Sequence, residues 1–234
     1  MQSTLEQFNE TASSEAFALQ NSKLLRVSLQ QITIQAKLGS MVAYQGDVSF
    51  EHSGSGGLSR MVKKAVTGEG TQLMKISGTG EVFLADTAQE IHLIKLEDDK
   101  VTCNGANVLA FDAGIDWDIE KVSGGAGAML GGGLFNVALK GSGWVAVISD
   151  GTPILLDIGQ APTFADAQAA ITWSSGVSTS LKTDLKAKNL IGRGSGESLQ
   201  VAFNGQGWVL VQPSEGRVVP SGVAGGAIGG LLGR

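Results

Sequence analysis

A short glycine motif occurs three times in this chain at an almost constant interval. Each copy is Gly-x-Gly flanked by apolar residues, and the copies are centred 63 and 64 residues apart on Thr79, Ser142 and Gln206. A second motif, an aromatic residue followed within three positions by glycine, keeps nearly the same period. Its aromatic residues are Tyr44, Phe111 and Trp173. Two independent motifs with one period indicate three copies of a single supersecondary unit.

Apolar and polar residues alternate through most of the chain, which is the pattern of half-buried β-strands. Turn signals such as Asn104-Gly105 and Asp150-Gly151 separate these runs. We therefore expect an all-β fold, in which three tandem β repeats of about 64 residues form a pseudo-threefold arrangement like a barrel or a β-helix. The whole chain, 1–234, is expected to be one domain. Its parts are lead strands at 1–40, repeat units at about 41–107, 108–170 and 171–217, and a glycine-rich flexible tail at 218–234.

Each unit interrupts its β pattern with a glycine-rich loop at the same place. Equivalent loops of a threefold arrangement meet at one end of the molecule, and loops on a rigid scaffold often carry function. The candidate contact residues are the apolar residues of these loops: Leu58, Met61, Met129, Leu130, Leu190 and Ile191. Arg193 stands among glycines in the third loop and is a candidate phosphate contact, with a plain surface loop as the alternative.

The first loop also has the pattern of a short amphipathic helix. Its apolar residues are spaced at i, i+3, i+4, i+7 and i+8 from Leu58, whereas Arg60, Lys63 and Lys64 fall on the other side. Such a helix resembles one that lies in the interface of an anionic membrane. The alternative is a helix that caps an open end of the β core, with the tail disordered or packed on a neighbouring chain.

Composition limits the function classes open to this chain. The formal net charge is −5 at pH 7, so no general basic surface is present and nucleic acid is not an expected partner. Cys103 is the single cysteine, which excludes an internal disulfide and fits a reducing compartment. No signal peptide or membrane-spanning stretch is evident. We expect a cytoplasmic protein, with a peripheral position on the inner face of the membrane as a further expectation.

Residues that usually carry catalysis or bind metals are scattered. His52 and His92 stand about 40 positions apart without metal-ligand spacing, and Cys103 has no CxxC partner. Gly-x-Gly lacks the third glycine of a dinucleotide loop, and it lies between strands as a hairpin turn or bulge instead of opening a helix. Asp116 and Asp118 share one polar strand face, which indicates solvated carboxylates. We therefore expect no enzyme activity, catalytic residue, metal site or cofactor.

Two tryptophans, Trp144 and Trp208, follow the second and third Gly-x-Gly copies at equivalent positions. Alternation places them on the face opposite Val145 and Val209, which are expected to enter one shared core with Val82. Because no second sheet is expected to cover the outer face, the tryptophans would form a flat apolar patch. We expect this patch to hold a homo-oligomer of cyclic symmetry together.

Several runs of the chain resemble the altered-inheritance-of-mitochondria, or mitochondrial biogenesis, family, and especially its bacterial branch. The resemblance covers nearly the whole chain, and its motifs are Gly39–Gly46, Lys63–Gly70, Gly132–Asn136, Ser149–Gly151 and Gln206–Val209. It implies a fold like the trp RNA-binding attenuation protein repeated in tandem. For eukaryotic relatives it also implies a link to mitochondrial inner-membrane organisation, a location not expected here because no transit peptide is evident. The resemblance implies no catalytic residue.

These observations favour a non-enzymatic binding or scaffold protein. We expect it to self-associate, to contact an anionic membrane surface as a peripheral protein, and to bind a further protein that the sequence does not identify. The alternative, from another class of function, is a small-ligand or RNA-binding module of the attenuation-protein type.

Overall fold

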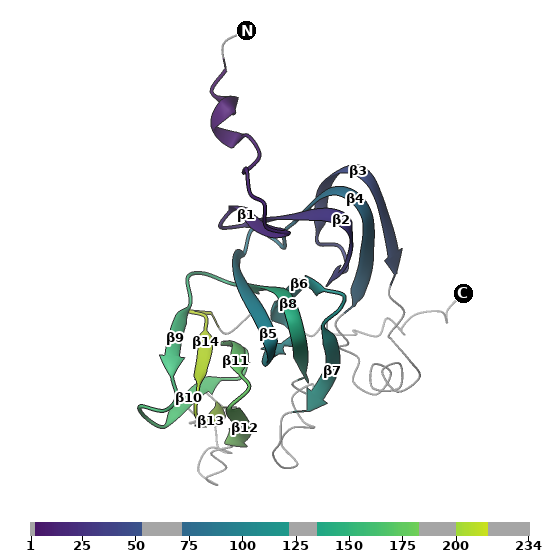
Figure 1. Cartoon of the computed structure of the whole chain (residues 1–234). Helices are drawn as coiled ribbons and strands as arrows, with labels where there is room; N and C mark the ends of the chain where they lie inside the picture. Colours follow the sequence, from purple (N-terminus) through teal and green to yellow (C-terminus); the bar gives the residue numbers. More distant parts are fainter. Residues whose placement is uncertain (1–2, 53–71, 122–134, 183–199, 215–234) are drawn as a thin grey trace, which may run out of the picture.

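The computed structural model describes residues 3–52, 72–121, 135–182 and 200–214, and these residues form an all-β protein, as predicted (Figure 1). The first strands are β1 (Phe17–Asn21), β2 (Leu24–Lys37), β3 (Met41–His52), β4 (Leu73–Leu84), β5 (Glu90–Asn104), β6 (Val108–Asp112) and β7 (Asp116–Lys121). The later strands are β8 (Phe135–Ser149), β9 (Ile154–Asp157), β10 (Thr163–Asp166), β11 (Ala170–Ser174), β12 (Val177–Lys182), β13 (Gln200–Gly205) and β14 (Trp208–Val211). Two short 3-10 turns, η1 (Leu5–Phe8) and η2 (Gly105–Asn107), accompany them. The helix expected in the first glycine-rich loop lies outside the described residues.

The strands form one large and one small antiparallel sheet. The eleven-stranded sheet has the order β3-β4-β2-β6-β8-β5-β11-β14-β9, with β1 added to β2 and β7 added to β8. The three-stranded sheet has the order β10-β13-β12. Within the described residues β3 and β9 do not pair, so no closed barrel is found there and the predicted barrel-like arrangement stays a prediction. Closure would require the first and last strands to share hydrogen bonds.

Buried apolar residues form three separate clusters. Val82, Val145 and Val209 are each fully buried, as expected, but each belongs to a different cluster. The expectation of one shared core is therefore wrong. A sheet of eleven strands twists progressively, so the inward faces of distant strands do not converge on a single centre. Each part of the sheet instead buries its own apolar face.

The Gly-x-Gly motif marks a bend inside a strand in its first two copies. In β4 and β8 the strand continues on both sides of the motif, and the facing strands β2 and β5 shift register there. All six glycines of the three copies have positive φ, from 114° at Gly205 to 152° at Gly80. A side chain at Gly80 would collide with the carbonyl oxygen of Gln45, so glycine permits this close approach of two backbones. A hairpin turn at the copies in β4 and β8 is therefore wrong, and a bulge fits them.

The aromatic motif lies against the Gly-x-Gly motif at all three places. Gly46 of β3 stands opposite the second glycine of the motif in β4. In the second unit, Trp144 N donates a hydrogen bond to Asp112 Oδ2 at 2.5 Å. In the third unit, Trp208 N donates one to Ser174 Oγ at 3.1 Å. Asp112 and Ser174 both follow the aromatic residue of their motif, so the same contact is made by two different acceptors.

Candidate functional site

The contact residues predicted for the glycine-rich loops lie outside the described residues. They belong to the segments 53–71, 122–134 and 183–199, and they are Leu58, Arg60, Met61, Lys63, Lys64, Met129, Leu130, Leu190, Ile191 and Arg193. Their clustering at one end of the molecule, and their contact with a membrane, therefore stay predictions.

The two tryptophans do not form an exposed patch, so this expectation is wrong. Trp144 and Trp208 are both partly buried, and each packs against one of the buried clusters. Lys95 Nζ of the neighbouring strand β5 lies 5.3 Å from the centre of the Trp144 ring, within the range of a cation–π contact. Burial raises the pKa of Asp112, which accepts the Trp144 hydrogen bond, while that bond acts in the opposite direction. Each ring is thus partly covered by the apolar side chains that it packs against.

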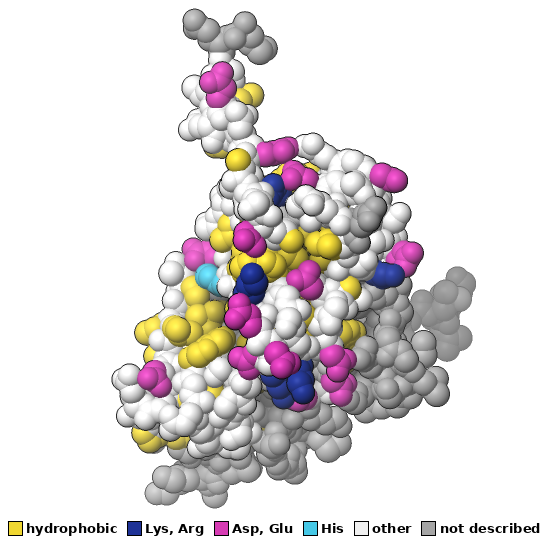
Figure 2. Space-filling view, viewed as in Figure 1, with side chains coloured by type: hydrophobic (Ala, Val, Ile, Leu, Met, Phe, Trp, Pro, Cys, Tyr) yellow, Lys and Arg dark blue, Asp and Glu magenta, His cyan; other side chains and the backbone are white. Residues whose placement is uncertain are grey.

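Exposed large apolar side chains lie at several places, among them the two outer strands, and those elsewhere are Leu5, Phe8, Leu38 and Phe164. Val42 and Tyr44 of β3 are 57% and 50% exposed, and Ile154 and Leu155 of β9 are 58% and 61% exposed. Both strands stand at the ends of the large sheet's strand order. A patch of hydrophobic side chains is visible over β9 in Figure 2, viewed as in Figure 1. The alternating apolar residues of β3 were visible in the sequence, but alternation does not distinguish an outer strand from an inner one.

Apart from these strands, one histidine–serine pair resembles a catalytic dyad. His92 Nε2 lies 2.7 Å from Ser149 Oγ, and the serine hydroxyl donates to the carbonyl of Gly151 at 2.7 Å. That donation leaves the histidine nitrogen as the donor to the serine, which is the reverse of the polarity needed to activate a nucleophile. Ser149 is also fully buried. The pair is therefore a structural hydrogen bond, and His92 is partly buried.

Cys103 is equally unsuited to nucleophilic chemistry. It is fully buried in β5, and its Sγ lies 3.2 Å from Thr172 Oγ1 of β11. Burial raises the pKa of the thiol to about 12, against a smaller opposite effect of the Thr172 contact. Since the thiolate is the reactive form of cysteine, this side chain is inert in the folded protein.

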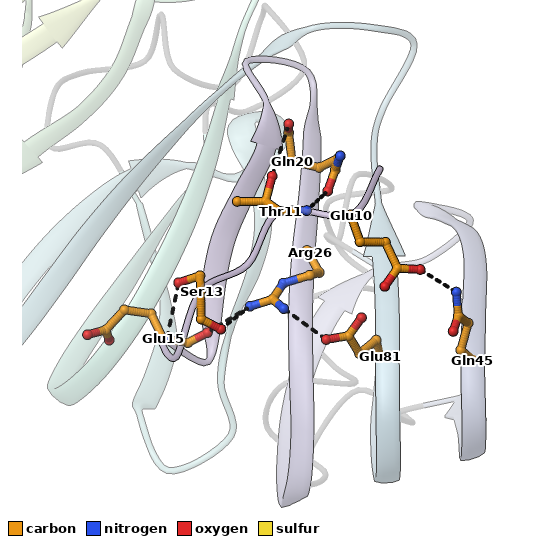
Figure 3. Close-up of polar contacts among 8 residues, drawn as sticks. All are labelled: Glu10, Thr11, Ser13, Glu15, Gln20, Arg26, Gln45 and Glu81. Carbon is orange, nitrogen blue, oxygen red and sulfur yellow. Dashed lines mark hydrogen bonds and ion pairs between the residues drawn. The ribbon is translucent and has the colours of Figure 1, made fainter. Parts of the chain in front are cut away.

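A buried arginine fixes the segment before β1 onto the sheet (Figure 3). Arg26 of β2 is 5% exposed, and its Nη1 donates to Glu81 Oε1 of β4 at 2.8 Å. Its Nη2 donates to the backbone carbonyls of Ser13 at 2.9 Å and Glu15 at 3.3 Å. Glu81 occupies the position that holds tryptophan in the other two copies of the motif. Glutamate in place of tryptophan at this position supplies the carboxylate that the buried Arg26 guanidinium requires.

Two further features are absent from the described part of the chain. No helix there is long and apolar enough to cross a membrane. Residues 3–52, 72–121, 135–182 and 200–214 also contain no group of three histidine, cysteine or carboxylate side chains placed to hold a metal ion.

The fold is shared with a solved structure. The chain is similar to protein SPYM3_0169 from Streptococcus pyogenes, known from an X-ray crystal structure, with a TM-score of 0.68 and 21% sequence identity. The likeness covers 84% of this chain and 91% of the streptococcal chain. At this level of identity it shows the fold alone.

The sequence itself defines the family. The chain belongs to the family Mitochondrial biogenesis AIM24, whose pattern matches residues 17–214. The family resemblance seen in the sequence is thereby confirmed, whereas the bacterial branch and the likeness to the attenuation protein stay predictions. Among curated proteins, no relative matches the chain.

Proposed function

We propose that this protein is a non-enzymatic scaffold that self-associates through the outer strands of its large sheet. The observation that carries the proposal is the exposure of apolar side chains on both β3 and β9. An outer strand also presents unpaired backbone N–H and C=O groups, which pair readily with another chain. The same strands therefore offer both an apolar contact and a row of hydrogen-bonding groups.

The sequence of these strands supports this role. Outer strands that must stay unpaired are usually protected by charged side chains, especially lysine, by proline, by bulges or by short length. β3 has the carboxylates Asp47 and Glu51 and a register shift between Met41 and Ala43. β3 is twelve residues long and contains neither lysine nor proline. β9 is short, with four residues, but it also lacks both residues, and its Ile154 and Leu155 face solvent. The longer strand is the stronger candidate for a stable contact.

The repeat supports an origin of this scaffold from three similar units. The aromatic and Gly-x-Gly motifs lie side by side at three places. At two of these places the backbone N–H of a tryptophan donates a hydrogen bond to the side chain of the residue after the aromatic position. We include in the proposal the predicted tandem repeat, the cytoplasmic location and the peripheral contact with an anionic membrane through the basic residues near Lys63. The membrane contact rests on the sequence pattern.

Lysine substitutions on the outer strands test the proposal. Tyr44→Lys and Leu155→Lys each place a solvated charge on an exposed apolar strand, so we expect the assembled fraction of the protein to fall in size-exclusion chromatography. Glu97→Lys, at an exposed position of the inner strand β5, is the control and should leave assembly unchanged. Equal elution of all four proteins, with unchanged thermal unfolding, would contradict the role of the outer strands.

A further inference from the structure

β3 presents one apolar and one polar face along an unshared edge. From Ala43 to His52 its register with β4 is continuous, and within the described residues β4 is its sole strand partner. Tyr44, Val48 and Phe50 share the apolar face, where the Tyr44 and Phe50 rings meet edge to face at 5.2 Å. Val48 and Phe50 pack against the first buried cluster. A strand added at this edge would extend that apolar face.

β3 is also bent, which limits what can pair with it. Gly46 has a φ of 96°, and a side chain there would lie 2.6 Å from the carbonyl oxygen of Thr79. β3 and β4 arch together (Figure 1), and the positive φ of Gly46 allows β3 to bend where the two backbones are closest. A partner strand keeps contact along the whole length only when it bends at the same place. A strand of four residues, such as β9, could pair with β3 on one side of the bend only.

We propose that the occupant of this edge is β3 of a second copy, paired antiparallel about a two-fold axis through Gly46. This inference rests on the proposed self-association and names its site. An axis perpendicular to the sheet places the bend of one strand on the same bend of the other, so both arms stay in contact. Isologous pairing of this kind closes on itself and gives a dimer.

The sequence of β3 is self-complementary in this register. Tyr44 of one copy stands opposite Val48 of the second copy, so apolar residues meet on the apolar face. On the polar face Gln45 stands opposite Asp47, and the Gln45 side chain also donates a hydrogen bond to Glu10 of its own chain. No like charges of the two β3 strands face each other directly. Glu51, the other carboxylate of the strand, lies 3.9 Å from Lys75 Nζ of its own chain. Each contact occurs twice because the two-fold axis repeats it.

Paired cysteines test the register. In the double variant Tyr44→Cys/Val48→Cys, each new thiol faces its counterpart in the other copy, so mild oxidation should give a dimer that reduction reverses. In an extended strand four residues span about 13 Å, but β3 bends at Gly46 between these two positions, as the contact of the Tyr44 and Phe50 rings shows. A disulfide within one chain is therefore distinguished by mass, and only a species of twice the chain mass counts as cross-linked. The two copies of either single position are offset by four residues and do not face each other. Both single variants are therefore matched controls and should stay uncross-linked. Cys103 does not interfere, since it is buried.

Charge changes at Gln45 give a second test that does not depend on a disulfide. Gln45→Lys places an opposite charge against Asp47 of the second copy, and Gln45→Asp places a like charge there. Because Gln45 also contacts Glu10 of its own chain, both variants are compared in a Glu10→Gln background. We expect the dimer dissociation constant of Gln45→Asp to be roughly two- to twentyfold larger than that of Gln45→Lys, from the usual range for cross-strand pairs. Equal constants, or cross-linking of the single cysteine variants as strong as of the double one, would overturn the β3 register. A dimer that persists in that case leaves the proposed self-association standing, whereas a monomeric native protein overturns both.

Discussion

At the level of single residues, His92 should make stability depend on pH. Burial lowers its pKa in the folded protein below the ordinary value of 6.5, against a smaller upward effect of Glu90. The unfolded chain therefore binds more protons than the folded chain between the two pKa values, and the folded state loses stability as pH falls below about 6.5. We expect denaturant unfolding to show a steeper loss from pH 7 to pH 5 in the native protein than in His92→Gln. Parallel curves for the two proteins would contradict this assignment.

Residue-level chemistry was only partly predictable from sequence. Spacing made His92 and Cys103 weak candidates for catalysis, and in the structure His92 contacts Ser149 and Cys103 contacts Thr172. The ion pair between Arg26 and Glu81 could not be predicted, because the two residues are separated by 55 positions and meet only after β2 and β4 pair. The visible signal was the replacement of tryptophan by Glu81 in the first copy. A charge at a position that elsewhere packs against a core indicates a buried partner of opposite sign.

At the level of elements, the glycines of the bent strands should be indispensable where backbones touch. Gly80→Ala places a methyl group against the Gln45 carbonyl at a φ of 152°, so we expect the free energy of unfolding to fall by about 2 kcal/mol or more. Gly114→Ala is the matched control in the aromatic motif, because nothing lies within 4 Å of the added methyl group. Its stability should change by less than about 1 kcal/mol. Equal losses in chemical denaturation would contradict the role of close backbone approach.

The elements themselves were more predictable than their arrangement. Alternation along β2, β4, β5 and β8 indicated strands because one face of each is buried. It did not give the order of the strands, since pairs such as β5 with β11 join residues far apart in the chain. For the same reason the prediction that the face of β8 bearing Trp144 is uncovered was wrong, because Trp144 is partly buried. Alternation gives the two faces of a strand, and only the neighbouring elements decide which face meets solvent.

At the level of the whole molecule, the basic residues of the first glycine-rich loop should bind an anionic surface. We expect the native protein to float with vesicles that contain anionic lipid, and not with neutral vesicles. Lys63→Glu/Lys64→Glu should weaken this binding on the order of tenfold or more, because each basic residue near the surface contributes about 1 kcal/mol. Lys23→Glu/Lys140→Glu, which changes the net charge equally at two exposed positions, is the control. Equal flotation of both double variants would argue against a specific membrane contact.

Self-association connects these levels, because it depends on the bent strand, its apolar side chains and the edge of the sheet together. Light scattering of the native protein across a concentration series tests it most directly. The account predicts a molar mass that rises to a multiple of the 24.1 kDa chain at low micromolar concentration and changes little with salt, since the contact is mainly apolar and backbone-mediated. A mass of one chain at every protein and salt concentration would contradict the account.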